Sequence, residues 1–197
     1  MQIITRLMEL YNQTDQRVAI FQLKSGLRCI AGCGHCCLTS KVQATILEML
    51  PAANEILLRG EASKWIERID ANAEASICAF YSAKLETDEP GHCGFYTWRP
   101  MVCRLFGFAS HRNRNGRKLL GVCKVLKEKK TLEVGAAKAI QDEALSFIEA
   151  SSLIYGLDPG LGTKLLPINI ALKKAIISLG LHMQMSSNEN LGNTTAA

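Results

Sequence analysis

The segment RCIAGCGHCCLTS, residues 28–40, holds four cysteines within nine residues: Cys29, Cys33, Cys36 and Cys37. The chain has eight cysteines, and the other four are Cys78, Cys93, Cys103 and Cys123. Three explanations compete for so much sulfur in so short a space: disulfides, a bound metal ion or cluster, and a redox-active or catalytic thiol. Which of these explanations is favoured depends on whether the compartment of the protein is oxidising or reducing.

The chain is predicted to be cytoplasmic. Residues 1–21 mix acidic and amide side chains through the apolar positions, so they lack the continuous apolar region of a secretory signal. No run approaches the roughly 18 apolar residues of a membrane span. Lasting disulfides are uncommon in a reducing cytoplasm, where clustered cysteines more often hold metal. Bound metal is therefore the favoured explanation, and no membrane partner is expected.

Length and composition predict one α-rich domain. With 197 residues, of which 48% are apolar, the chain can bury a core of its own. We expect this single domain to span residues 1–185 and a small, polar, disordered tail to follow over residues 186–197. The net charge of +5 is mild and indicates no nucleic-acid partner, because nucleic-acid binders concentrate more charge on one face.

Helical periodicity dominates the chain outside the cysteine-rich stretch. Helices are predicted over residues 2–22, 41–50, 51–59, 61–72, 131–155 and 167–183. Thr39 and Ser40 are expected to cap the second helix, Pro51 to start the third and Gly60 to end it. The apolar faces of the last two helices are Ile140, Ala144, Phe147 and Ile148, and Ile168, Leu172, Ala175, Ile176 and Leu179.

The remaining segments are irregular or short. Residues 82–92 are polar and predict a loop, and residues 99–106 predict a short helical turn. Residues 106–122 predict a β-hairpin, with Asn115–Gly116 as its turn. The predicted fold class is therefore mainly α: a small single domain of helices with an irregular cysteine-rich insert and one β-hairpin.

Soft anionic thiolates match zinc and the iron of clusters. The Cys33–Cys36 pair has the spacing of a metal knuckle, in which Gly32 and Gly34 permit the sharp bend. The side chains of the adjacent Cys36 and Cys37 diverge, so one is expected to serve a second site, to bridge two ions or to stay unligated. Eight sulfurs permit two four-sulfur sites, or one cluster with extra thiols, and spacing leaves both open.

Other polar side chains lie near the sulfurs in the sequence. Arg28, Arg99 and Arg104 could offset the negative charge of a thiolate site. His35 and His92 could each replace a thiolate as a ligand, although hydrogen bonding or exposure to solvent is the commoner role for a histidine.

Three ordered motifs resemble a known family. CIAGCGHCC (29–37), GHCGFYTWRPMVCRLFGF (91–108) and GVCK (121–124) resemble the YkgJ-type cysteine-cluster proteins, also called the CxxCxxCC putative zinc- or iron-chelating domain family. The family's C-x-(I/F)-Y-x-x-R-P-x-x-C-R element matches Cys93, Tyr96, Arg99, Pro100, Cys103 and Arg104, and its downstream cysteine matches Cys123. The resemblance covers roughly residues 29–125. The chain departs from the family's name in having three residues, not two, between Cys29 and Cys33.

The resemblance implies metal or iron–sulfur binding without a settled reaction. Some relatives that modify flagellin lysine are linked to an iron–sulfur centre, so an enzymatic role stays open. A rival is the radical S-adenosylmethionine signature, whose spacing Cys29, Cys33 and Cys36 share. Such enzymes need alternating strands and helices, which this chain does not show, and an aromatic residue where it has His35.

We therefore expect a metal-binding protein that holds an iron–sulfur cluster, with [4Fe–4S] favoured and zinc as the alternative, because eight thiols exceed what one zinc site needs. Its role would be in redox chemistry or metal handling. The alternative is an iron–sulfur-dependent enzyme, of a protein-modifying or radical S-adenosylmethionine type. No catalytic residue is assigned. The expected ligands are first Cys33, Cys36, Cys93 and Cys103, and then Cys29, Cys37, Cys78 and Cys123.

Overall fold

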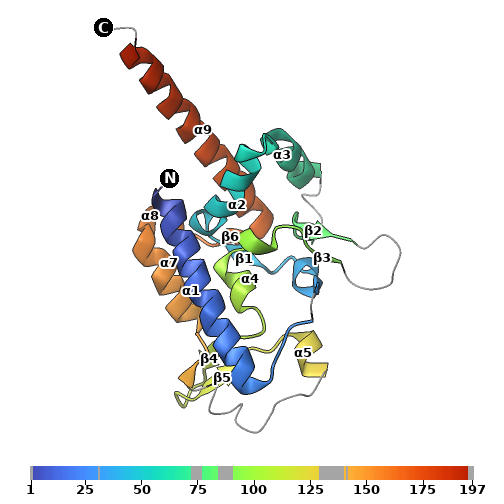
Figure 1. Cartoon of the computed structure of the whole chain (residues 1–197). Coiled ribbons are helices and arrows are strands. Elements are labelled where there is room, and N and C mark those ends of the chain that lie inside the picture. The colour runs from blue at the N-terminus through green and yellow to red at the C-terminus, as the bar shows by residue number, and fades with distance from the viewer. Residues whose placement is uncertain are drawn as a thin grey trace.

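The computed structural model describes residues 2–30, 32–71, 77–83, 91–128, 140 and 142–194, and it is mainly helical, as predicted (Figure 1). Its α-helices are α1 (Gln2–Ser25), α2 (Ile46–Leu58), α3 (Ala62–Ala71), α4 (Met101–Leu105), α5 (Lys124–Glu128), α7 (Phe147–Leu157), α8 (Pro159–Gly162) and α9 (Ile168–Thr194). Two 3₁₀ turns, η1 (His35–Leu38) and η2 (Tyr96–Trp98), lie in the cysteine-rich part of the chain.

The strands of the described residues form three two-stranded antiparallel sheets. These pair β1 (Gln43–Ala44) with β6 (Leu166–Pro167), β2 (Tyr81–Ser82) with β3 (His92–Cys93), and β4 (Ser110–Arg112) with β5 (Lys118–Leu120). The β4–β5 pair is the predicted hairpin, and Gly116 supplies its turn with a φ of +75°. The β1–β6 pair joins two segments that are far apart in the sequence.

The main hydrophobic core forms around α2, which packs most extensively against α9. The buried face of α9 includes Ile168, Leu172, Ala175 and Ile176, as the apolar stripe predicts. Helix α1 packs on the other side of the core through Leu7 and Tyr11, and the Tyr11 hydroxyl donates to the backbone oxygen of Glu48 at 2.8 Å. Most of the fold is thus held by helix-on-helix packing.

A second, smaller hydrophobic cluster lies at the C-terminal end of α1, near the β4–β5 hairpin and α5 (Figure 1). Its buried members are Phe21, Leu27, Phe108, Leu126 and Ala144. The rings of Phe21 and Phe108 meet edge to face at 6.4 Å between centroids. The described part of the chain thus forms two apolar clusters; Cys37 and Cys78 belong to the first, and Cys123 packs against the second.

Several predicted boundaries are wrong. Helix α2 begins after Thr45, not after Thr39 or Ser40, because Thr45 and Glu48 form a capping box. Pro51 lies inside α2 instead of starting a separate helix. In the region predicted as a helix over 131–155, residues 131–139 and 141 lie outside the described part, and α7 begins only after Ser146, with Phe147 and Ile148 exposed and Ala150 and Ile154 buried.

The C-terminal part of α9 extends beyond the rest of the fold (Figure 1). The helix continues to Thr194, and residues 195–197 lie outside the described part. The division of the chain into a domain over 1–185 and a disordered tail over 186–197 stays a prediction.

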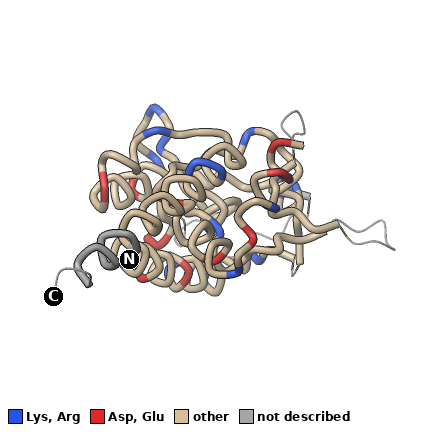
Figure 2. The backbone as a smooth tube through the Cα atoms, turned by 90° about the horizontal axis from the view of Figure 1, so that it is seen from above, with Lys and Arg blue, Asp and Glu red and all other residues tan. Residues whose placement is uncertain are grey.

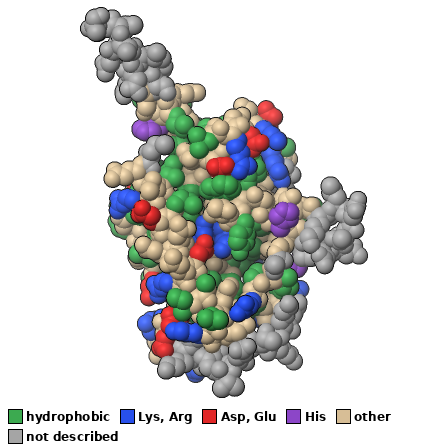
Figure 3. Space-filling model, viewed as in Figure 1, with side chains coloured by type: hydrophobic (Ala, Val, Ile, Leu, Met, Phe, Trp, Pro, Cys, Tyr) green, Lys and Arg blue, Asp and Glu red, His purple; other side chains and the backbone are tan. Residues whose placement is uncertain are grey.

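Surface charge is distributed over many elements. Lys and Arg positions are interspersed with Asp and Glu along the backbone (Figure 2). On the face drawn in Figure 3, apolar side chains also lie among charged ones. Within the residues that the structure describes, no helix is both long enough and apolar enough to cross a membrane.

Candidate metal centre

All eight cysteines line a single cavity of about 380 Å³. Cys29 and Cys33 reach it from the loop after α1, Cys36 and Cys37 from η1, Cys78 from the turn before β2, Cys93 from β3, Cys103 from α4 and Cys123 from the segment before α5. All eight are free, so no disulfide joins them. The fold therefore brings the four cysteines of residues 29–37 together with the four of residues 78–123, all as free thiols.

The first cysteine segment is a tight knuckle packed against the β2–β3 hairpin. The Cys37 N–H donates to the Gly34 carbonyl at 2.8 Å, which closes the η1 turn. A Cβ added to Gly34 would lie 2.2 Å from the carbonyl oxygen of Gly91 and 2.9 Å from the Tyr81 ring. Only glycine fits this contact, so Gly34 lets the knuckle approach the hairpin that carries Cys93.

Backbone hydrogen bonds then fix Cys78 and Cys93 beside the knuckle. The Cys78 N–H donates to the Cys37 carbonyl at 2.8 Å, which ties the two cysteine segments directly. Cys93 is the β3 residue paired with Tyr81 in β2. The side chain of Asn169 in α9 accepts from the Ala79 N–H at 2.8 Å and holds the turn that follows Cys78. These contacts position three cysteine segments through backbone atoms.

Cys103 is positioned by α4, whose N-terminus rests on Glu48. The buried Glu48 carboxylate accepts from the Thr45 N–H at 2.8 Å and from the Thr45 hydroxyl at 2.9 Å. Burial raises the pKa of Glu48 above its ordinary value, and hydrogen bonds from Thr45 and from the backbone of Met101 and Val102 oppose that rise. One carboxylate therefore links the first turns of α2 and α4.

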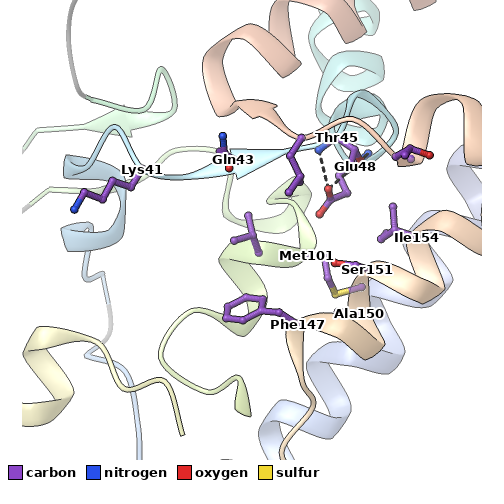
Figure 4. Close-up of a pocket in the computed structure, with 13 residues that line it drawn as sticks. Lys41, Gln43, Thr45, Glu48, Met101, Phe147, Ala150, Ser151 and Ile154 are labelled. Atoms are coloured by element: carbon purple, nitrogen blue, oxygen red, sulfur yellow. Dashed lines mark hydrogen bonds between the residues drawn. The ribbon is translucent and has the colours of Figure 1, made fainter. Parts of the chain in front are cut away.

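Glu48 also borders a second cavity, of about 400 Å³, which lies beside α4 (Figure 4). Met101, Phe147, Ala150 and Ile154 give its walls an apolar character. The dashed line in Figure 4 marks the bond between Thr45 and Glu48, which keeps the carboxylate occupied within the protein. This cavity has no cysteine in its wall, so we assign the candidate chemistry to the first one.

Cys123 reaches the cavity from the side of the second hydrophobic cluster. It packs against that cluster and immediately precedes α5. Gly107 adopts a φ of +87°, and a Cβ built on it would lie 3.6 Å from the Cys123 sulfur. The bend at Gly107 therefore allows the chain after α4 to pass close to Cys123.

The thiols interact closely enough to change each other's acidity. Side-chain hydrogen bonding with Cys36, Cys78 and Cys93 raises the pKa of Cys37. Bonding to Cys37 lowers the pKa of each of these three partners, and that of Cys36 falls to about 7. Cys37 thus keeps its proton, while its three neighbours become more acidic. These neighbours therefore favour the thiolate form, which is the form that binds metal.

Two further thiols have raised pKa values. Burial raises the pKa of Cys103. Burial and then the nearby Cys33, Cys123 and Cys36 raise the pKa of Cys29 to about 11. Among the residues that the structure describes, no three Cys, His, Asp or Glu side chains already have the geometry of a ligand set for one ion. Binding would therefore require loss of thiol protons and a closer approach of the sulfurs.

Two arginines give the cavity wall positive charge. Arg104 is only 4% exposed; it donates to the Arg99 carbonyl at 3.0 Å and pairs with Asp15, and its guanidinium lies 4.3 Å from the Tyr11 ring centroid. Arg99 lies 3.6 Å from the ring centroid of Tyr96 and 3.4 Å from Asp15. Arg28, the third arginine expected near the sulfurs, is exposed and does not line the cavity.

Arg99 carries a buried hydrogen-bond donor without a partner. Its Nε is buried, has no acceptor within hydrogen-bonding distance in the described part of the chain, and belongs to a residue that lines the thiol cavity. A buried donor of this kind is costly unless something accepts from it. An anionic, thiolate-ligated centre would supply that acceptor, so the donor set of the cavity fits a metal or cluster.

The two candidate histidines differ in position. His35 lies in η1 and lines the cavity, whereas His92 in β3 is exposed and does not.

Sequence reasoning missed Asp15, which pairs with both cavity arginines from the middle of α1. It also missed Glu48. No motif marks Asp15, whereas the Thr45–Glu48 spacing is a capping signal that the sequence does contain.

Comparison with known proteins agrees with this cysteine arrangement. The family model described as "CxxCxxCC: Putative zinc- or iron-chelating domain" matches residues 28–134, which is more than half of the chain. Comparisons with curated proteins and with solved structures gave no significant match. The matched segment contains every cysteine of the cavity. The chain therefore belongs to the CxxCxxCC family of putative zinc- or iron-chelating domains.

Proposed function

We propose that the cavity holds an iron–sulfur cluster, with [4Fe–4S] favoured over zinc, and that the protein acts in redox chemistry or metal handling in a reducing cytoplasm. The observation that carries this proposal is the convergence of eight free thiols on one cavity. One zinc ion takes about four ligands, so eight thiols exceed the need of a single zinc site. When bound, such a cluster supplies one-electron transfer.

The proposed cluster ligands come from the cysteines that pack against the main core. These are Cys36, Cys78, Cys93 and Cys103, while Cys37 hydrogen-bonds to the first three of them. The hydrogen bond from Cys78 to Cys37 and the pairing of Cys93 with Tyr81 support this choice, because they hold three segments in fixed relation. Cys33, one of the first ligands expected from sequence spacing, lines the same cavity but is not among the described residues that pack against the main core.

The arginines of the wall would stabilise the charged centre. Several thiolates give a cluster net negative charge, and an apolar surrounding makes that charge costly. Arg99 would donate its unpaired Nε–H to a sulfur atom, and Arg104 would hold Arg99 in place through the bond to its carbonyl. Hydrogen bonds to the sulfurs also tune the potential of such clusters.

Anaerobic purification tests the proposal. A brown protein with broad visible absorption, iron and acid-labile sulfide, and loss of all three in Cys78→Ser/Cys93→Ser, is the expected result. The matched control Ser82→Ala changes an exposed β2 residue that does not line the cavity and should leave the spectrum intact. A colourless, zinc-loaded protein would overturn the iron–sulfur proposal, and a folded protein without any metal would overturn metal binding altogether.

An enzyme is the second candidate, because the cavity is accessible from outside. Cys29 and Tyr96, both in its wall, are exposed, the latter by 62%. A radical S-adenosylmethionine enzyme is disfavoured, since the described sheets are two-stranded and antiparallel and do not form a barrel of alternating strands and helices. Adding S-adenosylmethionine to the reduced protein should leave its electron paramagnetic resonance spectrum unchanged; a new signal would favour this enzyme class.

A further inference from the structure

The cavity of about 400 Å³ beside α4 is separated from the thiol cavity by that helix (Figure 4). Met101 and Val102 line the first cavity, whereas Cys103 and Arg104, which follow them in α4, line the second. Because successive residues of a helix turn by about 100°, these two pairs lie on different faces of α4. The chain thus carries a cavity without sulfur next to the candidate metal centre.

The interior of this cavity is apolar and buried. Met101, Ala150 and Ile154 in its wall are 3%, 2% and 2% exposed. Glu48 is the one acidic residue that the structure describes in the wall, and it is 5% exposed. Its Oε2 already accepts from both the N–H and the hydroxyl of Thr45. The interior therefore offers a ligand mainly apolar contact.

The mouth of the cavity consists of exposed residues from α7 and from the segment between α8 and β6. Phe147 and Leu165 are 41% and 56% exposed, although both are large and apolar. Ser151 and Thr163, which also line the cavity, are exposed as well. An opening with apolar side chains around it, leading to a buried apolar interior, is typical of a site that accepts an apolar group.

Two lysines give the mouth positive charge. Lys41 is exposed and lines the cavity, and Lys164 is exposed and lies between Thr163 and Leu165, which both line it. Neither ammonium pairs with a carboxylate of the residues that the structure describes. In Figure 4 the Lys41 side chain extends away from the apolar walls, and its flexible four-carbon stem allows the ammonium to turn towards a bound anion.

We propose that this cavity binds a small amphipathic anion, with an aliphatic tail against the buried apolar wall and a carboxylate at the mouth near Lys41 and Lys164. A cationic head group would be repelled by the two lysines, and a neutral one would leave them unpaired. Burial raises the pKa of Glu48, which reduces the negative charge that the ligand meets. The cavity volume lies in the range of about 300–1,000 Å³ that small-molecule sites have. The site uses no cysteine, so it does not depend on the proposed metal centre.

Calorimetric titration with octanoate, octan-1-ol and octylamine tests the head group, because these probes share one aliphatic tail length. We expect one octanoate per chain, roughly fivefold weaker binding of octan-1-ol, and the weakest binding of octylamine. Lys41→Gln/Lys164→Gln should bind octanoate about as weakly as octan-1-ol. The control Lys64→Gln/Lys174→Gln removes the same charge at two exposed lysines outside the wall and should bind octanoate like the wild type.

Two results of this titration would overturn the proposal. One is tighter binding of octylamine than of octanoate, which would mean that the head group is wrong. The other is the absence of saturable octanoate binding, and sedimentation would then show whether a second copy of the chain covers the mouth instead.

Variants of α7 locate the bound tail. Ser151→Phe places a ring at an exposed position of the wall and should abolish octanoate binding. The control Ser152→Phe places the same ring at the next exposed position, outside the wall, and should bind octanoate like the wild type. In the unmodified protein, nuclear magnetic resonance covers a variant that fails to fold: octanoate should shift the methyl signal of Met101 and not that of Met183 in α9. Undiminished binding in Ser151→Phe, or an unchanged Met101 signal at saturation, would overturn the site.

Discussion

Gly34 shows how a single residue permits the two cysteine groups to meet. Its Cα faces the backbone of Gly91, and any Cβ there would lie 2.2 Å from a carbonyl oxygen. The contact is with backbone, which cannot rotate away as a side chain can. The position of the knuckle on the β2–β3 hairpin therefore depends on the absence of one methyl group.

Gly34→Ala should consequently separate the knuckle from the hairpin. Forced overpacking of this kind costs about 1–3 kcal/mol, so we expect a lower melting temperature and a loss of bound metal. Gly94→Ala is the matched control, because its Cβ would lie at an ordinary 3.6 Å from the Phe80 carbonyl. Thermal unfolding and metal analysis of both variants check this. Equal melting temperatures and metal contents in Gly34→Ala and Gly94→Ala would show that the close contact at Gly34 does not affect stability or metal binding.

Replacing Arg99 tests whether positive charge in the cavity wall stabilises the bound metal. Arg99→Met removes positive charge and the unpaired Nε donor from the cavity while retaining an apolar side chain of similar length. Transfer of metal to a competing chelator should become faster by roughly tenfold, as expected for loss of about 1.4 kcal/mol from a charged hydrogen bond. Arg59→Met is the control, since Arg59 also stacks on aromatic rings, at 5.4 Å from those of Phe95 and Trp98, but lies outside the cavity. Equal release rates in the wild type and Arg99→Met would contradict the role of the guanidinium.

Two helices, α2 and α7, begin with the same capping box, but the glutamate is buried in the first and exposed to solvent in the second. The carboxylates of Glu48 at the start of α2 and Glu149 at the start of α7 each accept from the residue three positions earlier. Burial raises the pKa of Glu48, whereas hydrogen bonds from Ser146 lower that of Glu149. The same motif should therefore respond to pH in opposite directions.

The sign follows from linkage. A raised folded-state pKa means that stability due to Glu48 is present below the ordinary glutamate value of 4.5 and is lost as pH rises through the folded-state pKa. A lowered pKa means that stability due to Glu149 is present above 4.5 and is lost as pH falls through its folded-state pKa. We expect the wild type to lose its advantage over Glu48→Gln as pH rises and over Glu149→Gln as pH falls, by chemical denaturation between about pH 3.5 and 7. Parallel pH profiles for the two variants would disprove this.

Elements could be predicted from the sequence where apolar periodicity and local turn chemistry agree. The stripe of α9 and the Asn115–Gly116 hairpin are of this kind. Pro51 predicts a helix start because a proline inside a helix costs about 3 kcal/mol locally, but α2 offsets this by burying residues on most of its surface. The start of α7 is marked by the capping spacing of Ser146 and Glu149, but the apolar residues Phe147 and Ile148 continue the period of Ile140 and Ala144, so periodicity alone predicts no break there.

In the molecule as a whole, the candidate centre joins the main hydrophobic core, to which Cys37 and Cys78 belong, to the second cluster, against which Cys123 packs. The sequence identified all eight cysteines of the cavity, because thiols in a close spacing are a chemical signal independent of the fold. Their division between the clusters could not be predicted, since it depends on how α1, α4 and α5 bring Phe21, Phe108 and Leu126 together. The ion pairs of Asp15 with Arg99 and Arg104 likewise join residues far apart in the sequence, so they too depend on long-range packing.

Metal removal should therefore loosen one part of the molecule selectively. Without metal, the amide hydrogens of η1, β3 and the loop after α1 should exchange faster, while those in the α2–α9 pair keep their protection, because these two helices contain no cysteine and pack directly on each other. Hydrogen exchange with mass spectrometry before and after chelation measures this. Faster exchange throughout α2 and α9 would show that the whole fold depends on the centre, and no change anywhere would show that metal contributes no stability.

The pairing of β1 with β6 has a consequence for biosynthesis. All eight cysteines precede β6 and α9 in the chain, and Ile168 at the start of α9 forms part of the cavity wall. A growing polypeptide thus presents every thiol to its surroundings before the segment that completes their enclosure has been synthesised.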